Sequence, residues 1–493
     1  MEDGFLLLVV LSVPRLAVNA APYKDRHRRN DCKDAILICG RRGEKRVAVR
    51  IRPNQRGSVL CWKRLNVPPT PPAKTHKLRW LREFGPGLIT GASDDDPSGI
   101  ATYSQAGAQL GFALSWVMVL TYPLMAAIQE ISARIGRTSG AGLAANIRRH
   151  YPPWILQSIV CLLCVANTIN IGADLGAMGE AVGLLVGGPV LLYTLLFALL
   201  CATLQIMMPY ARYVGGLKWL ALSLLGYFAT LGMIKVPWAS VAHGLLVPTF
   251  TLDVKFWSTL VAVLGTTISP YMFFWQASQE VEDIAALPER EALISTPRQA
   301  AHAFQRIRLD TFAGMAFSNL VALAIIITTA ATLHASGVTN IDTAAQAAAS
   351  LRPLAGPFAE ALFAAGIVST GLLAVPVLAG SMAYALAETH DWPASLGYVP
   401  RKAKAFYATI AIGTISGALL NFMPVSPIKA LYWSAVVNGL VAVPVMIIMM
   451  LLSRDTRVMG RFGISLTLRA VGWIATLVMA AAAAILVLTT FVK

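Results

Sequence analysis

The segment GASDDDPSGI, residues 91–100, lies inside an otherwise apolar stretch that runs from about residue 84 to residue 110. Three consecutive carboxylates in a stretch of membrane-spanning length are costly, because each ionised group must leave water. Pro97 removes a backbone donor and clashes with the preceding turn, so a regular helix cannot pass through it. We therefore predict a membrane helix that is broken near Pro97. Exposed backbone carbonyls and at least one carboxylate at such a break would form a cation site of hard oxygen ligands. The alternative is a cytoplasmic turn followed by a helix that starts at Ile100.

The composition places this segment in a membrane protein. Of 493 residues, 56% are hydrophobic and only 13% are charged, and the mean hydropathy is +0.61. A soluble protein carries about 25% charged residues. Long apolar runs predict an all-α polytopic protein, since a membrane barrel would show short alternating strands. The loops contain no His/Cys metal cluster, phosphate-binding loop or nucleophile constellation, so we do not expect an enzyme.

Eleven apolar segments are long enough to cross a bilayer, which requires about 20 residues. Their approximate ranges are 84–110, 112–135, 154–182, 188–209, 214–235, 256–279, 311–333, 358–386, 404–423, 430–452 and 468–491. We therefore expect residues 81–493 to form one transmembrane domain.

Residues 1–80 form a basic tail before this domain. Residues 1–83 hold 19 Lys and Arg against 7 Asp and Glu, out of a net charge of +16 for the whole chain. We expect the tail to be disordered or to lie on anionic lipid. A translation start downstream of residue 70, or a cleaved signal at the apolar residues 5–11, would remove part of it. The positive charge lies in this tail and is not spread over a nucleic-acid-binding surface, so no nucleic-acid partner is expected. The alternative is a regulatory or nucleic-acid role for the tail itself.

The loops predict the orientation in the membrane. Lys and Arg concentrate in the loops 136–153, 210–213, 280–310, 387–403 and 453–467. The opposite loops are poor in both: 183–187 has none, 334–357 has only Arg352 and 424–429 has only Lys429. The positive-inside rule then places the N-terminus in the cytoplasm and the C-terminus outside, in an inner or plasma membrane.

The sixth span repeats the features of the first. It reads LGTTISPYMFFWQASQE over residues 264–280 and carries Pro270 in its middle. The dipeptides at 96–97 and 269–270 lie five spans apart, so the two halves have opposite topologies. We predict an inverted repeat with halves at about 84–235 and 256–452, followed by an extra helix at 468–491. Two broken helices in matching positions indicate a transporter whose binding site lies at mid-membrane.

The third span adds a polar face. Asn167, Asn170 and Asp174 recur at three- and four-residue spacing, so they lie on one side of a helix. This face could line a path for water or ions, or it could form hydrogen bonds between helices. The sequence leaves both interpretations open.

The motifs of the first two spans resemble those of the Nramp family of divalent metal transporters. The resemblance is carried by GPGL at 85–88, DPSG at 96–99, QAGAQLG at 105–111 and SARIG at 132–136. It extends from about Pro86 to the C-terminus. It implies a LeuT-like 5+5 inverted-repeat fold with broken helices 1 and 6, and a transported ion rather than a resident cofactor.

The metal-binding motifs of that family are changed here. The family's first-span motif is Asp-Pro-Gly-Asn, in which Asp and Asn bind the metal; Asp96 matches, but Gly99 replaces the Asn. Its sixth-span motif is Met-Pro-His, with the Met thioether as a ligand. Ser269 replaces the Met and Tyr271 replaces the His. The backbone carbonyl that joins the site in the family aligns with Thr266.

Residues that the family uses elsewhere are also changed. The second sixth-span His aligns with Gln276, and a tenth-span Gln aligns with Ala435. Asp174 matches a third-span Asp tied to proton movement, but Ala177 replaces the Glu that follows it. The loss of these groups argues against obligatory proton coupling.

These changes resemble the Nramp-related magnesium transporters, a branch without the Met. A thioether favours late transition metals, whereas Mg²⁺ keeps several waters and binds one or two carboxylates. The expected ion ligands are Asp96, with Asp95, the carbonyls near Ala92 and Thr266, and the hydroxyls of Thr266 and Ser269.

The expected function is Mg²⁺ and Mn²⁺ uptake by alternating access, with Asp174, Asn170, Tyr271 and Gln276 along the ion path. The rivals are a proton-coupled Mn²⁺/Fe²⁺ importer and an organic-solute transporter on the same fold. A carboxylate at the break argues against a site for amino-acid carboxylates. The sequence does not indicate an oligomeric state.

Overall fold

The computed structural model describes residues 35–39, 45–51, 59–64, 91, 94–207, 224–251, 253–286 and 290–491. The chain divides into two units, Met1–Lys77 and Leu78–Lys493. The second unit contains all the predicted membrane spans.

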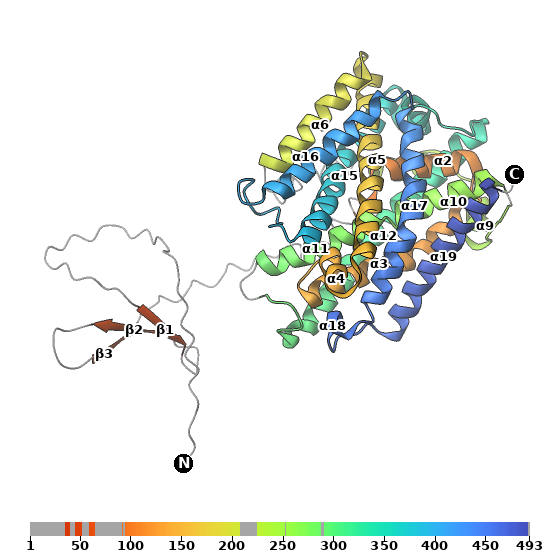
Figure 1. Ribbon diagram of the computed structural model, residues 1–493. Coiled ribbons are helices and arrows are strands. Elements are labelled where there is room, and N and C mark those ends of the chain that lie inside the picture. The colour runs from red at the N-terminus through yellow and green to blue at the C-terminus, as the bar shows by residue number, and fades with distance from the viewer. Residues whose placement is uncertain are drawn as a thin grey trace. The chain divides into compact units, whose positions relative to one another are not determined.

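Three strands form in the first unit, where we expected a disordered tail. They are β1 (Ala35–Cys39), β2 (Lys45–Ile51) and β3 (Val59–Arg64), paired antiparallel in the order β1-β2-β3 (Figure 1). Val49 of β2 lies opposite Ala35 of β1 and Cys61 of β3. These short segments are rich in Val, Ile and Leu, which favour strands. We predicted disorder because the tail is strongly charged, and we gave less weight to these short apolar segments.

The described part of the second unit is helical. Its α-helices are α2 (Pro97–Leu110), α3 (Ser115–Ser139), α4 (Leu143–His150), α5 (Pro153–Val186), α6 (Val190–Met207), α8 (Leu225–Met233), α9 (Trp238–Leu246), α10 (Val254–Thr267), α11 (Pro270–Ala286), α12 (Ala300–Thr332), α13 (Ala344–Ala348), α14 (Arg352–Ala355), α15 (Ala359–His390), α16 (Lys404–Leu419), α17 (Pro427–Leu452), α18 (Thr456–Met459) and α19 (Leu466–Phe491). Figure 1 shows the long helices gathered into one bundle.

Nine helical segments among the described residues are long and apolar enough to cross a membrane, and they correspond to nine of the eleven predicted spans. The other two are only partly described. Residues 84–90 and 92–93 of the first span, and 208–223 around the start of the fifth, lie outside the described residues. We did not anticipate the short helices α4 and α9, which lie between spans.

Both predicted helix breaks are present. In the first span, Asp96 is the N-cap of α2 and Pro97 is its first residue. In the sixth span, α10 ends at Thr267 and α11 begins at Pro270. Between them Ile268 leaves helical geometry, with φ −122° and ψ 61°. Proline at the first helical position loses no intrahelical hydrogen bond, which explains why each new helix starts there.

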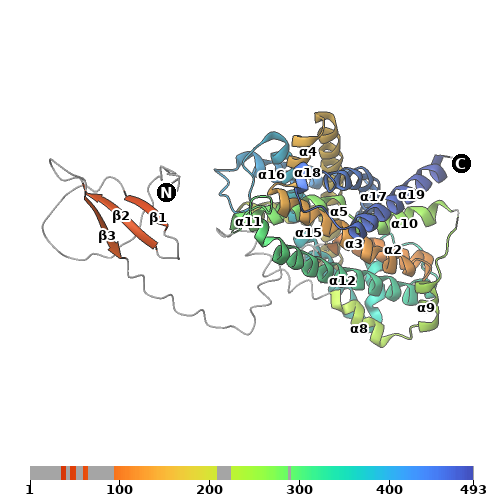
Figure 2. The ribbon, with the colours of Figure 1, turned by 90° about the horizontal axis from the view of Figure 1, so that it is seen from below.

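Close packing brings the two broken helices together in the centre of the bundle. α2 packs against α10, α12 and α17, while α5 packs against α15 and α17 (Figures 1 and 2). Glycine allows the closest approach: a Cβ on Gly265 would lie 2.1 Å from the carbonyl oxygen of Ala435. α10 and α17 therefore touch backbone to backbone beside the break.

An ion-pair cluster joins α11 and α12 beyond the sixth-span break. Arg306 lies 2.5 Å from Glu280 and 3.4 Å from Asp283, and the Glu280 side chain is fully buried. Arg290 also pairs with Asp283. Because a buried carboxylate without a partner would be strongly destabilising, this cluster fixes how the two helices meet.

Candidate cation site at the two helix breaks

The Asp96 carboxylate lies at the start of α2 and is 1% exposed. Its Oδ1 accepts hydrogen bonds from the backbone N–H of Gly99 at 2.7 Å and from the Ser98 hydroxyl at 2.6 Å. These are the bonds of a helix cap, in which a short side chain accepts from the unpaired N–H groups of the first turn. The cap and the positive end of the helix dipole stabilise a negative charge at this position.

The other oxygen of Asp96 faces two further helices. Its Oδ2 accepts from Asn170 Nδ2 of α5 at 3.1 Å and from the Tyr271 hydroxyl of α11 at 3.4 Å. Asn170 in turn accepts a 2.7 Å hydrogen bond from the Ser434 hydroxyl of α17. The structure therefore brings three residues predicted separately from spans 1, 3 and 6 into one cluster.

Gly99 lies where the two broken helices meet. A Cβ placed on Gly99 would lie 3.3 Å from Thr266 Oγ1 of α10 and 3.3 Å from the Tyr103 ring. Gly99 therefore leaves little space beyond its own backbone, and Thr266 faces it directly. This contact connects the first-span break with the end of α10.

Ser269 also lies at the sixth-span break and is 2% exposed. Its hydroxyl donates to the carbonyls of Gly265 at 2.7 Å and Thr266 at 3.0 Å. The Ser269 oxygen can still offer lone pairs to a cation, while the Thr266 carbonyl already accepts one hydrogen bond.

Asp94 and Asp95 share a partner that the sequence analysis missed. The Ser318 hydroxyl of α12 lies 2.6 Å from Asp94 Oδ2 and 3.2 Å from Asp95 Oδ1. Among the described residues, the remaining oxygen of each carboxylate has no hydrogen-bond partner. A serine hydroxyl carries one hydrogen, so it satisfies one carboxylate at a time. The polar pair Ser318-Asn319 inside an apolar span was the available signal for this position.

The other predicted residues of the ion path are buried at different depths of the bundle. Asp174 lies one helical turn beyond Asn170 on α5, and neither of its oxygens has a hydrogen-bond partner within the described structure. Gln276 is buried in α11, beyond Tyr271. Asn167 instead turns toward α15, where it donates to Ser381 at 2.8 Å. Ala92 lies outside the described residues.

The described residues contain no group of three or more His, Cys, Asp and Glu side chains arranged to hold a metal ion. The cluster around Asp96 offers carboxylate, hydroxyl and backbone oxygens. These are the ligand types that Mg²⁺ and Mn²⁺ accept.

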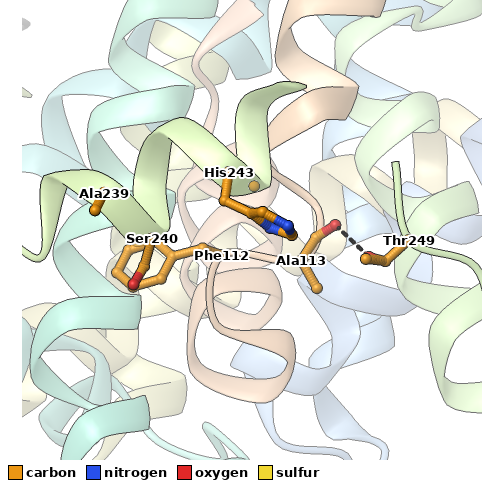
Figure 3. A pocket seen from close by; sticks show the side chains of 7 residues that line it. Phe112, Ala113, Ala239, Ser240, His243 and Thr249 are labelled. Atoms are coloured by element: carbon orange, nitrogen blue, oxygen red, sulfur yellow. Dashed lines mark hydrogen bonds between the residues drawn. The ribbon is translucent and has the colours of Figure 1, made fainter. Parts of the chain in front are cut away.

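Two cavities lie away from these residues. One of about 520 Å³ is lined by α9 and by the turn before α3, where Thr249 donates to the carbonyl of Ala113 at 3.0 Å (Figure 3). Another of about 180 Å³ is lined by residues of α4, α11 and α15, including Glu282 and Glu388. None of the predicted site residues lines either cavity.

A membrane bundle with two broken helices that meet at a buried carboxylate is the architecture of a secondary transporter. The sequence identifies the family of this transporter. Residues 87–489 match the model of the family described as "Natural resistance-associated macrophage protein-like", so the chain belongs to the Nramp family of divalent metal transporters. It is an integral membrane protein.

Individual relatives agree with this assignment. The chain is 29% identical over 326 residues to the "Divalent metal cation transporter MntH" of Yersinia enterocolitica, covering 64% of this chain and 74% of the relative. Its fold is similar to that of the Eremococcus coleocola manganese transporter, with a TM-score of 0.66, 16% identity and coverage of 84% and 87%. A structure of Mhp1, a nucleobase-cation-symport-1 family transporter, gives a TM-score of 0.52 at 15% identity, with coverage of 83% and 93%. These structural likenesses support the predicted inverted-repeat fold.

Proposed function

We propose that this protein carries Mg²⁺, and the chemically similar Mn²⁺, into the cell by alternating access without obligatory proton coupling. The observation that carries the proposal is the buried Asp96 carboxylate at the meeting point of the two helix breaks. Its neighbours supply oxygen ligands, while Ser269 stands where the wider family has a thioether. A hard, partly hydrated cation suits this ligand set better than a soft one.

The proposed ion shell combines Asp96 with hydroxyl and carbonyl oxygens from Thr266 and Ser269, the neighbouring Asp95 and retained water. Gly99 keeps the two broken helices close, since a side chain there would press on Thr266. The carbonyl of Ala92 belongs to the same proposed shell. Tyr271 and Gln276 then lie along the ion's path on α11.

In the proposed orientation the N-terminus lies in the cytoplasm and the C-terminus outside, and the membrane potential supplies the driving force for the ion. A membrane potential that is negative inside favours entry of a divalent ion by about 4.6 kcal/mol per 100 mV, twice the value for one charge. Uptake therefore needs no second ion. The absence of a Glu at Ala177 and of His at Tyr271 and Gln276 supports this uncoupled mode.

A second candidate is a proton-coupled Mn²⁺ or Fe²⁺ importer. It is favoured by the relatives that are named for divalent metal or manganese transport. The Asp174 carboxylate is buried one turn from Asn170 and has no hydrogen-bond partner among the described residues, so it is a group that could take part in proton movement.

Transport in proteoliposomes tests the two candidates. Vesicles containing the full chain and a pH-sensitive dye are given external Mg²⁺ or Mn²⁺, with protein-free vesicles as the control. We expect both ions to enter, driven by an inside-negative potential, without acidification of the lumen. Entry of Mn²⁺ with acidification, and no entry of Mg²⁺, would replace this proposal with the proton-coupled candidate.

A further inference from the structure

A chain of hydrogen bonds links α17 to the Asp96 carboxylate through α5. The Ser434 hydroxyl donates to Asn170 Oδ1 at 2.7 Å, and Asn170 Nδ2 donates to Asp96 Oδ2 at 3.1 Å. All three side chains are 1% exposed or less. In so buried an environment, each contact is stronger than it would be in water, and an unpaired amide would be costly.

The chemistry of these groups fixes the direction of the chain. An ionised carboxylate only accepts hydrogen bonds, so Asn170 must present its NH₂ group to Asp96. Its amide oxygen then points to α17, where Ser434 holds it. The Ser434 hydrogen is shared with the carbonyl of Leu431, which lies 2.7 Å away on the same helix. Asn170 is therefore a donor to Asp96, and its oxygen is turned away from the proposed ion.

The bonds around Asp96 show which direction is left for a cation. Oδ1 is held by two short bonds from its own helix, and Oδ2 by Asn170 at 3.1 Å. The contact from Tyr271 is the longest, at 3.4 Å, and therefore the weakest. A cation can displace this contact most readily, provided that Asn170 keeps Oδ2 in place.

We propose that Ser434 and Asn170 are positioning residues that orient the Asp96 carboxylate toward the cation. This inference rests on the proposed function, because it concerns the same site. Ser434 acts through Asn170, and Asn170 acts through Asp96; neither residue contacts the ion. Cation affinity then depends on a serine of α17 that lies outside the family motifs.

The test measures KM and maximal rate for Mg²⁺ and Mn²⁺ uptake in proteoliposomes. Ser434→Ala should raise KM about tenfold, as expected for loss of a buried hydrogen bond, with the maximal rate changed less than about twofold. Ser434→Thr keeps the hydroxyl and should restore KM. The double variant Asn170→Ala/Ser434→Ala should match Asn170→Ala alone, because residues in one hydrogen-bond chain are not additive.

A second Asn–Ser pair offers a matched control, because its asparagine lies on α5 with Asn170. Asn167 donates to Ser381 of α15 at 2.8 Å, and Ser381 also donates to a carbonyl three residues earlier in its own helix, as Ser434 does. This pair does not touch Asp96. Ser381→Ala should therefore leave KM unchanged, even if it lowers thermal stability as much as Ser434→Ala does.

Three results would overturn the positioning role: an unchanged KM in Ser434→Ala, additive effects in the double variant, or an equal rise of KM in Ser381→Ala. Mn²⁺-dependent thermal stabilisation of the purified protein gives a readout that does not need transport. If the wild type is stabilised by Mn²⁺ but transports neither ion, the proposed function fails. The thermal measurement then still tests whether Ser434 and Asn170 position the Asp96 carboxylate. A wild type that neither transports nor is stabilised by either ion would contradict both.

Discussion

At the residue scale, two of the positions at which this chain departs from the family motifs lie one at each helix break. Gly99 faces Thr266, and a Cβ there would lie 3.3 Å from its hydroxyl oxygen. Ser269 turns its hydroxyl to carbonyls of its own helix. In the proposed alignment both replace side chains that bind the metal directly in the family, which is why we propose an ion that keeps part of its water.

The selectivity should therefore change when both ligands are restored. Gly99→Asn combined with Ser269→Met should shift uptake from Mg²⁺ toward Mn²⁺, Fe²⁺ or Cd²⁺, because the restored thioether favours transition metals. Competition between ions in the uptake assay measures this. Gly99→Ala with Ser269→Leu fills the same two positions without metal-binding groups and should slow transport without changing the order of preference. An unchanged preference in the first double variant would mean that these positions do not line the site.

Only some of the residues in the candidate site could be predicted from the sequence. The breaks at Pro97 and Pro270 are local consequences of proline chemistry and placed Asp96 at a site in advance. The resemblance to the Nramp motifs added Gly99, Thr266 and Tyr271. The partners Ser318 and Ser434 could not. Each joins the cluster across more than 200 residues of sequence. A polar residue in an apolar span can be noticed, as Ser318 beside Asn319 could be, but it gives no sign of the helix that it will meet.

At the element scale, the pairing of α10 with α17 holds the sixth-span break in place. A Cβ on Gly265 would lie 2.1 Å from the carbonyl oxygen of Ala435 and 2.4 Å from the backbone nitrogen of Gly439. Backbone atoms cannot rotate away as a side chain can. A larger residue at Gly265 would therefore push the two helices apart.

Gly265→Ala should lower the stability of the protein by about 1–3 kcal/mol, the usual cost of overpacking a buried contact. Thermal unfolding of the purified protein in detergent measures this. Gly232→Ala is the matched control, since Gly232 lies in α8 and a Cβ there would meet nothing within 4 Å. Alanine should leave stability unchanged or raise it there, because it favours helix over glycine. Equal unfolding temperatures for the two variants would contradict close packing at the break.

The sequence predicted the long helices better than the short helices and strands. Long apolar runs fixed most spans, including α5, which was predicted at 154–182 and extends over Pro153–Val186. The helices α4 and α9 were missed, because they are only 8 and 9 residues long and make no distinct hydropathy peak. The strands of the first unit were missed because we gave the charge of the tail more weight than its short apolar segments.

At the scale of the whole molecule, the fold and the buried carboxylate agree with the transporter family to which the chain belongs. Two inverted halves place their broken helices at the centre, and Asp96 lies where those breaks meet. The cluster of Arg306, Glu280 and Asp283 fixes α11 against α12 beyond the break. The inverted-repeat organisation was predictable because it follows from the number of spans and from two helix breaks that lie five spans apart. Ion preference, coupling and orientation are still proposals.

The central claim is that the Asp96 carboxylate binds the transported ion. The direct measurement is Mg²⁺ and Mn²⁺ influx into proteoliposomes containing the wild type, Asp96→Ala or Asp96→Asn, each checked for folding by gel filtration. Asp391→Asn is the matched control, because its 82% exposed side chain pairs only with Arg148 among the described residues. We predict that both Asp96 variants fall to the level of protein-free vesicles while Asp391→Asn transports at the wild-type rate. Robust influx through a folded Asp96→Ala protein would contradict the account.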